Sequence, residues 1–295
     1  MNPLIIVAGS TGDLGGRLIK SLRQRGATVR ALVRPGTDAA KQAALTELGA
    51  EVVAADFHDP AALAQACAGG SCVVSALAGL REVIVDAQTQ LLDAAVAAGV
   101  PRFIASDFCS DYTRLTPGEN RNFDLRREFA AVLDQAPIAG TSVLNGAFGE
   151  ILGYNIPLLD LKKQQVGYWE DADWPIDFTT MDDTAAFTAA AALDEHAPRL
   201  LRIASFQITP RQLSAVAEAA QHRPFPLVPL GTRAELRTQI QQARAADPAG
   251  EQKLYAGFQQ MQYLLSMFSV TNDPLDNARY PGLSWTGAAQ VLAHK

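Results

Sequence analysis

The chain has 295 residues, of which 48% are hydrophobic and 19% are charged, and its formal net charge is −6 at pH 7. This composition is ordinary for a globular protein with a sizeable core, and an acidic balance without a basic stripe argues against nucleic-acid binding. The longest apolar stretch, residues 185–193, is far shorter than the roughly 20 residues of a membrane span. The start of the chain lacks the basic region and cleavage site of a secretory leader. We therefore expect a cytoplasmic monomer or homodimer without nucleic-acid or membrane partners.

Cysteine and histidine show no pattern that would hold a metal. Cys67, Cys72 and Cys109 are irregularly spaced, and none of the four histidines lies at a metal-ligand spacing from another histidine or a cysteine. Three unpatterned cysteines are typical of free thiols in a reducing compartment. We expect no metal site.

An apolar run at the start of the chain leads directly into a glycine-rich turn. Residues 4–8 are apolar and partly β-branched, which predicts a buried parallel strand, and an amphipathic helical pattern begins at residue 14. The intervening segment is Gly9-Ser10-Thr11-Gly12-Asp13-Leu14-Gly15. Gly9 permits the tight turn, Gly12 leaves room for a pyrophosphate beside the backbone, and Gly15 lets the helix pack closely on the strand. We predict that residues 9–15 hold the phosphates of a dinucleotide at the helix N-terminus.

The first half of the chain alternates strand and helix patterns. Strands are predicted at residues 4–8, 28–33, 51–55, 72–75, 103–105 and 141–144, and helices at 14–25, 38–48, 60–68, 83–98 and 122–134. Such alternation builds right-handed βαβ units around a parallel sheet. The predicted fold is therefore α/β, a Rossmann-type doubly wound parallel sheet with a smaller, irregular α+β substrate-binding lobe.

The alternation ends after residue 144. Residues 146–176 are rich in Gly, Pro, Tyr and Trp, and they precede a strand at 176–180, an alanine-rich helix to about 193, a short strand at 200–203 and helices at 210–220 and 233–245. We predict an NADP-binding domain over residues 1–150 and a substrate-binding lobe over 151–295, with about 176–205 returning to the main sheet.

The end of the second predicted strand distinguishes NADP(H) from NAD(H). An NAD site places an acid there to bind the ribose, whereas a 2′-phosphate requires a cation. This chain has Arg34 at that point, no acid beside it, and Lys41 in the next helix. Arg34 therefore predicts NADP(H), unless it is an ordinary surface arginine. Asp56 either meets the adenine or caps a helix, and Ala76, Leu77 and Ala78 either pass beneath the cofactor or simply pack.

The proton-relay pair of ordinary short-chain dehydrogenases, a Tyr followed four residues later by a Lys, is absent at all six tyrosines. The chain instead resembles the NmrA-like atypical short-chain dehydrogenases, and within them the isoflavone reductase-like proteins such as phenylcoumaran benzylic ether reductases and aromatic alcohol reductases. The resemblance covers nearly the whole chain. It is carried by residues 9–15, 32–34, 75–79, 102–108, 145–148 and 280–286.

The resemblance implies NADPH binding and reduction of a small aromatic molecule, and it assigns further site residues. Ser106 and Phe108 belong to a motif near the cofactor. The family's catalytic lysine lies three residues after a phenylalanine, here Phe123, so Arg126 stands in its place. Arginine stays protonated and cannot act as a general base, but it can act as a fixed cation unless it is a plain helix-face residue.

Three more residues complete the expected site. Tyr112 is the proton donor we predict in place of the missing lysine, unless it only packs. Asn145 and Phe148 follow the sixth predicted strand, at the edge of the sheet where ligands of such folds bind. An aromatic set either lines a substrate pocket or forms the core of the lobe; its members are Tyr154, Tyr168, Trp169, Trp174 and Phe178.

Two functions fit these features. The first is an NADPH-dependent reductase that transfers hydride to a small aromatic or conjugated carbonyl or ether substrate. The alternative is a non-catalytic NADP(H)-binding redox sensor of the NmrA type, which the arginine at position 126 keeps open.

Overall fold

The computed structural model describes residues 2–293, and these form two compact units. The first unit comprises residues up to Phe108 together with Leu125–Val143 and Thr184–Leu201. The second comprises Cys109–Asp124, Leu144–Asp183 and the chain from Arg202 onwards. Each unit is therefore assembled from three segments of the chain, and residue 150 is not a boundary between them.

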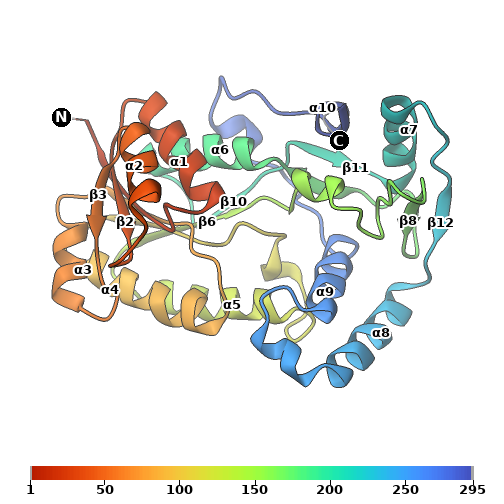
Figure 1. The fold of residues 1–295 in the computed structure, drawn as a ribbon, viewed down its shortest axis with the longest axis horizontal. Helices are drawn as coiled ribbons and strands as arrows, with labels where there is room; N and C mark the ends of the chain where they lie inside the picture. Colours follow the sequence, from red (N-terminus) through yellow and green to blue (C-terminus); the bar gives the residue numbers. More distant parts are fainter. Residues whose placement is uncertain (1, 294–295) are drawn as a thin grey trace. The chain divides into compact units, whose positions relative to one another are not determined.

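The first unit is built on a seven-stranded sheet with the order β3-β2-β1-β4-β5-β6-β10 (Figure 1). Its strands are β1 Leu4–Ala8, β2 Thr28–Val33, β3 Glu51–Ala54, β4 Cys72–Ser75, β5 Arg102–Ala105, β6 Ala139–Leu144 and β10 Leu200–Arg202. The pairs from β3 across to β6 are all parallel. The strands β1, β4 and β5 in the middle of this sheet are almost entirely buried, whereas the edge strand β3 is partly exposed. The parallel sheet with buried central strands confirms the doubly wound α/β fold.

Helices cover both faces of this sheet. On one face, α3 Pro60–Cys67, α4 Gln88–Ala97 and α5 Arg121–Leu133 contribute side chains to one core cluster with β1, β4 and β5. Figure 1 shows α1 Asp13–Gln24, α2 Ala39–Glu47 and α6 Met181–Leu193 on the other side of the sheet. Asp38 and Asp59 cap α2 and α3 by accepting backbone N–H groups.

One stretch of the first unit departs from regular helix geometry. Residues Glu82–Ala87 form a wide π-helical turn that runs directly into α4. The sequence predicts a single helix over residues 83–98, and the helix is present. The π-turn was not predicted, because the apolar pattern of a helix changes little when one turn is widened.

The second unit has small sheets and separate helices. A three-stranded sheet has the order β11 Phe206–Ile208, β9 Ile176–Thr179, β7 Ala147–Phe148, and a two-stranded sheet pairs β12 Leu227–Pro229 with β8 Val166–Tyr168. The helices are α7 Pro210–Gln221, α8 Arg233–Ala246, α9 Gly257–Met267 and α10 Ala288–Ala293. Short 3₁₀ turns lie at Tyr112–Arg114, Gly149–Gly153, Pro248–Gln252 and Asn277–Arg279. Of the region 176–205, β10 joins the main sheet, while β9 pairs in the small sheet.

Candidate functional site

The turn between β1 and α1 requires glycine at two positions for reasons internal to the fold. Gly9 has a φ of +75°, and a Cβ on it would lie 2.3 Å from the carbonyl oxygen of Ala76. A Cβ on Gly15 would lie 2.3 Å from the carbonyl oxygen of Gly9. Neither position accepts a side chain without moving backbone, so both glycines shape the turn itself.

The backbone environment of Gly12 differs from that of Gly9 and Gly15. Its backbone is extended, with φ −79° and ψ 165°, and a Cβ there would meet only the Gly9 oxygen, at 3.3 Å. Gly12 is the N-cap of α1, and it offers no side chain to the first-turn N–H groups. The fold therefore leaves an open surface at the N-terminus of α1, which is the arrangement that suits a phosphate.

The other residues of the turn have separate tasks. The hydroxyl of Ser10 is buried and donates to the carbonyl of Leu32, 2.8 Å away, which joins the turn to β2. Thr11 and Asp13 are exposed, and Asp13 accepts from Arg17 at 2.7 Å. Leu14 is half-buried on the first turn of α1.

The end of β2 presents an exposed cation. Arg34 is exposed, its carbonyl accepts from the N–H and hydroxyl of Thr37, and its guanidinium has no hydrogen bond or ion pair with any residue of 2–293. Lys41 is exposed on α2, and the carboxylate of Asp38 is engaged as the cap of that helix. The strand tip therefore offers positive charge with no competing acid, which fits a 2′-phosphate.

Asp56 follows β3 and is exposed. Its Oδ1 accepts the N–H of His58 at 2.9 Å, so it caps a turn before α3. One oxygen of the Asp56 carboxylate is thus used in this turn. The role of Asp56 at the adenine stays a prediction.

The ends of β4 and β5 are tied to the glycine turn. The N–H of Ala76 donates to the Ala8 carbonyl at 2.9 Å, and Ala76 closes on Gly9. The hydroxyl of Ser106 donates to the Leu77 carbonyl at 2.6 Å, and the Ser106 N–H donates to Oε1 of Gln88 at 2.9 Å. The structure thus brings residues 9–15, Ala76–Ala78 and Ser106 together at the carboxyl edge of the sheet, with Phe108 buried next to them in sequence.

Arg126 lies in the half-buried middle of α5, within the part of that helix that belongs to the first unit. Two residues further on, Glu128 is paired with Arg81. Arg126 is permanently charged, so α5 carries a fixed cation where the resemblance expects a lysine.

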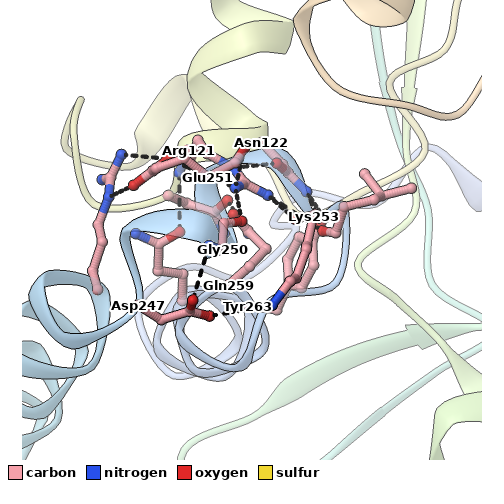
Figure 2. Close-up of polar contacts among 12 residues, drawn as sticks. Arg121, Asn122, Asp247, Gly250, Glu251, Lys253, Gln259 and Tyr263 are labelled. Carbon is pink, nitrogen blue, oxygen red and sulfur yellow. Dashed lines mark hydrogen bonds and ion pairs between the residues drawn. The ribbon is translucent and has the colours of Figure 1, made fainter.

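The first turn of α5 is held by a dense set of hydrogen bonds in the second unit (Figure 2). The guanidinium of Arg121 donates to the carbonyls of Gly250 and Lys253, at 3.0 and 2.9 Å, and lies over the ring of Phe258. Asn122 donates to the hydroxyl of Tyr263 at 2.7 Å. These contacts fix where α5 begins, and no sequence motif predicts them.

Tyr112 lies in the second unit and is only 1% exposed. It follows Asp111, a fully buried carboxylate that accepts from Arg202 at 2.7 Å and pairs with Arg114 at 3.2 Å. These two ion pairs to a buried carboxylate hold the segment that contains Tyr112. Its role as proton donor remains a prediction.

Asn145 and Phe148 also lie in the second unit. Asn145 is buried directly after β6, and its carbonyl accepts from the Thr179 hydroxyl at 2.6 Å. Gly146 has a φ of +66° and packs so closely on Asp177 that a Cβ would lie 2.5 Å from the Asp177 Cβ. Phe148 is half-buried in β7. Their roles toward cofactor or substrate stay predictions.

The aromatic set is mainly part of the core of the second unit. Trp169 packs edge-on against Phe268 with ring centroids 5.4 Å apart, and the indole N–H of Trp174 donates to the Met267 carbonyl at 3.1 Å. Phe178 is buried in the hydrophobic core of the second unit, and Tyr168 is partly buried and packs against that core, whereas Tyr154 is exposed. Of the two interpretations left open by the sequence, core packing describes four of the five residues.

Two other features bear on the class of site. Among residues 2–293, no three or more His, Cys, Asp or Glu side chains are grouped so as to hold a metal ion. No helix in the same range is long and apolar enough to cross a membrane.

A parallel doubly wound sheet with this glycine turn between β1 and α1 defines the class of Rossmann-type dinucleotide-binding folds. The model of the NmrA-like family matches residues 1–261, and the chain belongs to that family. This confirms the resemblance based on the sequence motifs.

Individual relatives agree with this assignment. Pinoresinol reductase 2 of Arabidopsis thaliana is 30% identical over 211 residues, which cover 67% of this chain and 66% of the relative, just under two thirds of its length. A bifunctional pinoresinol-lariciresinol reductase of Linum usitatissimum is 29% identical over 225 residues, covering 71% of this chain and 72% of the relative. The solved structure of AtPrR2 with NADP⁺ and (+)-pinoresinol superimposes with a TM-score of 0.81 at 24% identity, covering 100% of this chain and 99% of that one.

Proposed function

We propose that this protein is an NADPH-dependent reductase that transfers hydride to a small aromatic or conjugated carbonyl or ether compound. The observation that carries the proposal is the N-terminus of α1 at Gly12, where a Cβ would meet only the Gly9 carbonyl oxygen, at 3.3 Å. A helix N-terminus that begins at glycine, with an exposed arginine at the tip of β2, is suited to a dinucleotide that carries an additional phosphate.

In this proposal the first unit holds the cofactor. Residues 9–15 bind the pyrophosphate, Arg34 and Lys41 bind the 2′-phosphate, Asp56 meets the adenine, and Ala76–Ala78 with Ser106 and Phe108 line the remainder. Bound NADPH would supply the hydride, and the protein's part is to bind, orient and charge-stabilise. The complex of AtPrR2 with NADP⁺ supports this choice of cofactor.

The substrate class is proposed from the relatives. Several are reductases of pinoresinol, a small aromatic molecule. Arg126 cannot accept a proton, so we assign it the task of a fixed cation that binds cofactor or polarises an oxygen of the acceptor. Tyr112 is assigned as proton donor, and Asn145 and Phe148 as contacts to nicotinamide or substrate.

The test is NADPH oxidation, followed at 340 nm, against enones, quinones, aromatic ethers and lignans. Turnover of at least one class is expected, and Arg126→Ala should lower it while Arg126→Lys keeps or raises it. Tyr112→Phe is expected to lower turnover without changing NADPH affinity. If NADPH binds tightly but no acceptor in the panel is reduced, the reductase proposal is overturned.

The arginine at position 126 also favours a second candidate, a non-catalytic NADP(H)-binding redox sensor. This candidate predicts NADPH binding without turnover, and no effect of Arg126→Lys on acceptor reduction. The same assay separates the two.

We further propose a reducing compartment, the cytoplasm, as the site of action. Cys67, Cys72 and Cys109 are all free and buried, and NADPH is used as a reductant in such a compartment. A monomer or a homodimer is proposed, and sedimentation velocity distinguishes them.

A further inference from the structure

A chain of hydrogen bonds within the first unit connects a buried carboxylate to the protein surface. Asp107 is 0% exposed, and its Oδ2 accepts from the hydroxyl of Ser142 at 2.6 Å. The Ser142 Oγ in turn accepts from Nη1 of Arg199 at 2.7 Å. Nε of Arg199 donates to Oδ1 of Asp134 at 2.6 Å, and the Asp134 side chain is about half exposed.

The direction of the hydrogen bonds in this chain is fixed by the groups at its two ends. A carboxylate only accepts and a guanidinium only donates, so the Ser142 hydroxyl must donate to Asp107 and accept from Arg199. Such an arrangement polarises the hydroxyl and strengthens both bonds. The positive charge of Arg199 therefore acts on the buried carboxylate through a single oxygen atom, which offsets the cost of burying that charge.

The backbone supports the same geometry. Ser142 lies on β6 opposite Ala105 of β5, and its N–H donates to the carbonyl of Arg199 at 2.8 Å. Residue 199 immediately precedes β10, so three neighbouring segments of the sheet supply the members of the chain. Their separation in sequence, 35 residues between 107 and 142 and 57 between 142 and 199, explains why no motif reveals them.

Asp107 lies between two residues assigned to the cofactor. Its neighbour Ser106 is bonded to the Leu77 carbonyl and to Gln88, and Phe108 is buried on the other side. A displacement of Asp107 would move this turn and the loop after β4 that rests on it.

We infer that Arg199 is a positioning residue for NADP(H), acting through Ser142 and Asp107 to hold the turn of residues 106–108 against the cofactor loop. The inference rests on the proposed function, because it concerns the affinity of that same site for its cofactor. Arg199 touches neither the glycine turn nor residues 76–78 in the described contacts, so it acts only through the chain.

The test is calorimetric titration of NADPH into the full-length protein and its variants. Arg199→Ala and Ser142→Ala should each weaken NADPH binding by roughly two- to thirtyfold, the range of coupling expected through packed, hydrogen-bonded residues. Ser142→Thr, which keeps the hydroxyl, and Arg199→Lys, which keeps the charge, should restore most of the affinity. The double variant should be no weaker than the worse single variant, because both break one chain.

A matched control and a second readout separate positioning from general damage. Arg211→Ala removes an exposed arginine paired with Asp173 and should leave NADPH affinity unchanged. At saturating NADPH, the KM for the organic acceptor should be unchanged in Arg199→Ala, whereas the KM for NADPH rises. Urea unfolding of each variant shows whether it is folded under the assay conditions.

The outcomes are distinguishable. If the wild-type protein binds no NADPH, the proposed function fails and this inference fails with it. If the wild type binds NADPH and Arg199→Ala binds it equally well, or if lysine and threonine give no rescue, the inference alone is overturned. Additive losses in the double variant would also overturn it, since they would mean that Arg199 acts by another route.

Discussion

Gly9 and Gly12 lie three residues apart in one turn and are constrained by different partners. Gly9 is required by the backbone of the protein, through its positive φ and the nearby Ala76 oxygen. Gly12 is in an extended conformation that any residue adopts, and a Cβ there would meet only the Gly9 oxygen, at 3.3 Å. In the proposed function the Gly12 position is set by the bound phosphate, whereas the Gly9 position is set by folding.

This difference gives a prediction for two substitutions. Gly12→Val should abolish NADPH binding, because its side chain would occupy the phosphate position, while the stability of the fold changes by only about 1 kcal/mol. Gly9→Ala should instead destabilise the protein, since its Cβ would collide with backbone. Fluorescence titration with NADPH and urea unfolding measure the two effects. Normal NADPH affinity in the Gly12 variant would contradict the assignment of the turn to phosphate.

Arg34 gives a second prediction at the scale of a residue. A charge-assisted hydrogen bond contributes roughly 1.5–3 kcal/mol, which corresponds to a preference for NADPH over NADH of about tenfold to a hundredfold. Arg34→Ala should remove most of that preference by weakening NADPH alone, and added salt should narrow it because the arginine is exposed. Calorimetric titration of both cofactors into both proteins is the measurement. Equal affinities for NADH and NADPH in the wild type would show that Arg34 does not select the cofactor.

At the scale of elements, Arg121 holds the start of α5 to the segment that precedes α9. Its guanidinium donates to four carbonyls, those of residues 250, 251, 253 and 254, and its side chain is 10% exposed. Arg121→Ala leaves these carbonyls without their charged donor, and we expect a loss of roughly 1–3 kcal/mol in unfolding free energy. Hydrogen exchange should rise in residues 248–256, while Arg211→Ala, in which an exposed pair is lost, leaves it unchanged. Unaltered exchange in the Arg121 variant would mean that the hydrogen bonds do not hold the segment.

The elements also show what the sequence predicts and where it does not suffice. Strands such as β1 and β4 follow from short apolar runs, and the helices of the first unit from amphipathic spacing and capping residues such as Asp59. Helix α9 was not predicted, because Gln259, Gln262 and Ser266 are buried among its apolar residues and interrupt the pattern. Strands of two or three residues, such as β7 and β12, are too short to show a period. They form because of partners distant in sequence.

The candidate site divides in the same way. The glycine turn and Arg34 are local signals that can be read directly from the sequence, and their roles toward the cofactor remain predictions. The hydrogen bonds of Ser106 to Leu77 and of Ser142 to Asp107 depend on which strands lie side by side. The spacing of these residues along the chain therefore does not predict them.

At the scale of the whole molecule, each unit has a hydrophobic core of its own. Two cysteine thiols are buried in the first unit, and their pKa values reflect that burial. Burial raises the pKa of the Cys72 thiol to about 12 from its ordinary value near 9, although Arg102 opposes the shift. Burial raises the pKa of Cys67 to about 11 for the same reason. The thiols bind their protons more tightly in the folded protein than in the unfolded chain. Their contribution to the free energy of unfolding is therefore complete below about pH 9, and it is lost as the pH rises towards 12.

The corresponding prediction concerns alkaline pH. Between pH 8 and pH 10 the wild-type protein should lose about 1 kcal/mol of unfolding free energy through Cys72, and Cys72→Ala should lose correspondingly less over the same interval. Urea unfolding at several pH values measures the slope for both proteins. Parallel slopes would show that the thiol is not withdrawn from solvent as described.

The π-turn at Glu82–Ala87 has a consequence for how this region tolerates change. A helix accommodates one surplus residue by widening a single turn, so a π-turn holds one residue more than the same turn of α-helix would. Gln88 follows it directly and supplies the oxygen that accepts the Ser106 N–H. Removing one residue of the turn would let it rewind to α-helical geometry without rotating the flanking segments, whereas removing one residue from α4 would rotate the two parts of that helix by about 100° relative to each other. This stretch should therefore tolerate a one-residue deletion better than the regular helix that follows it.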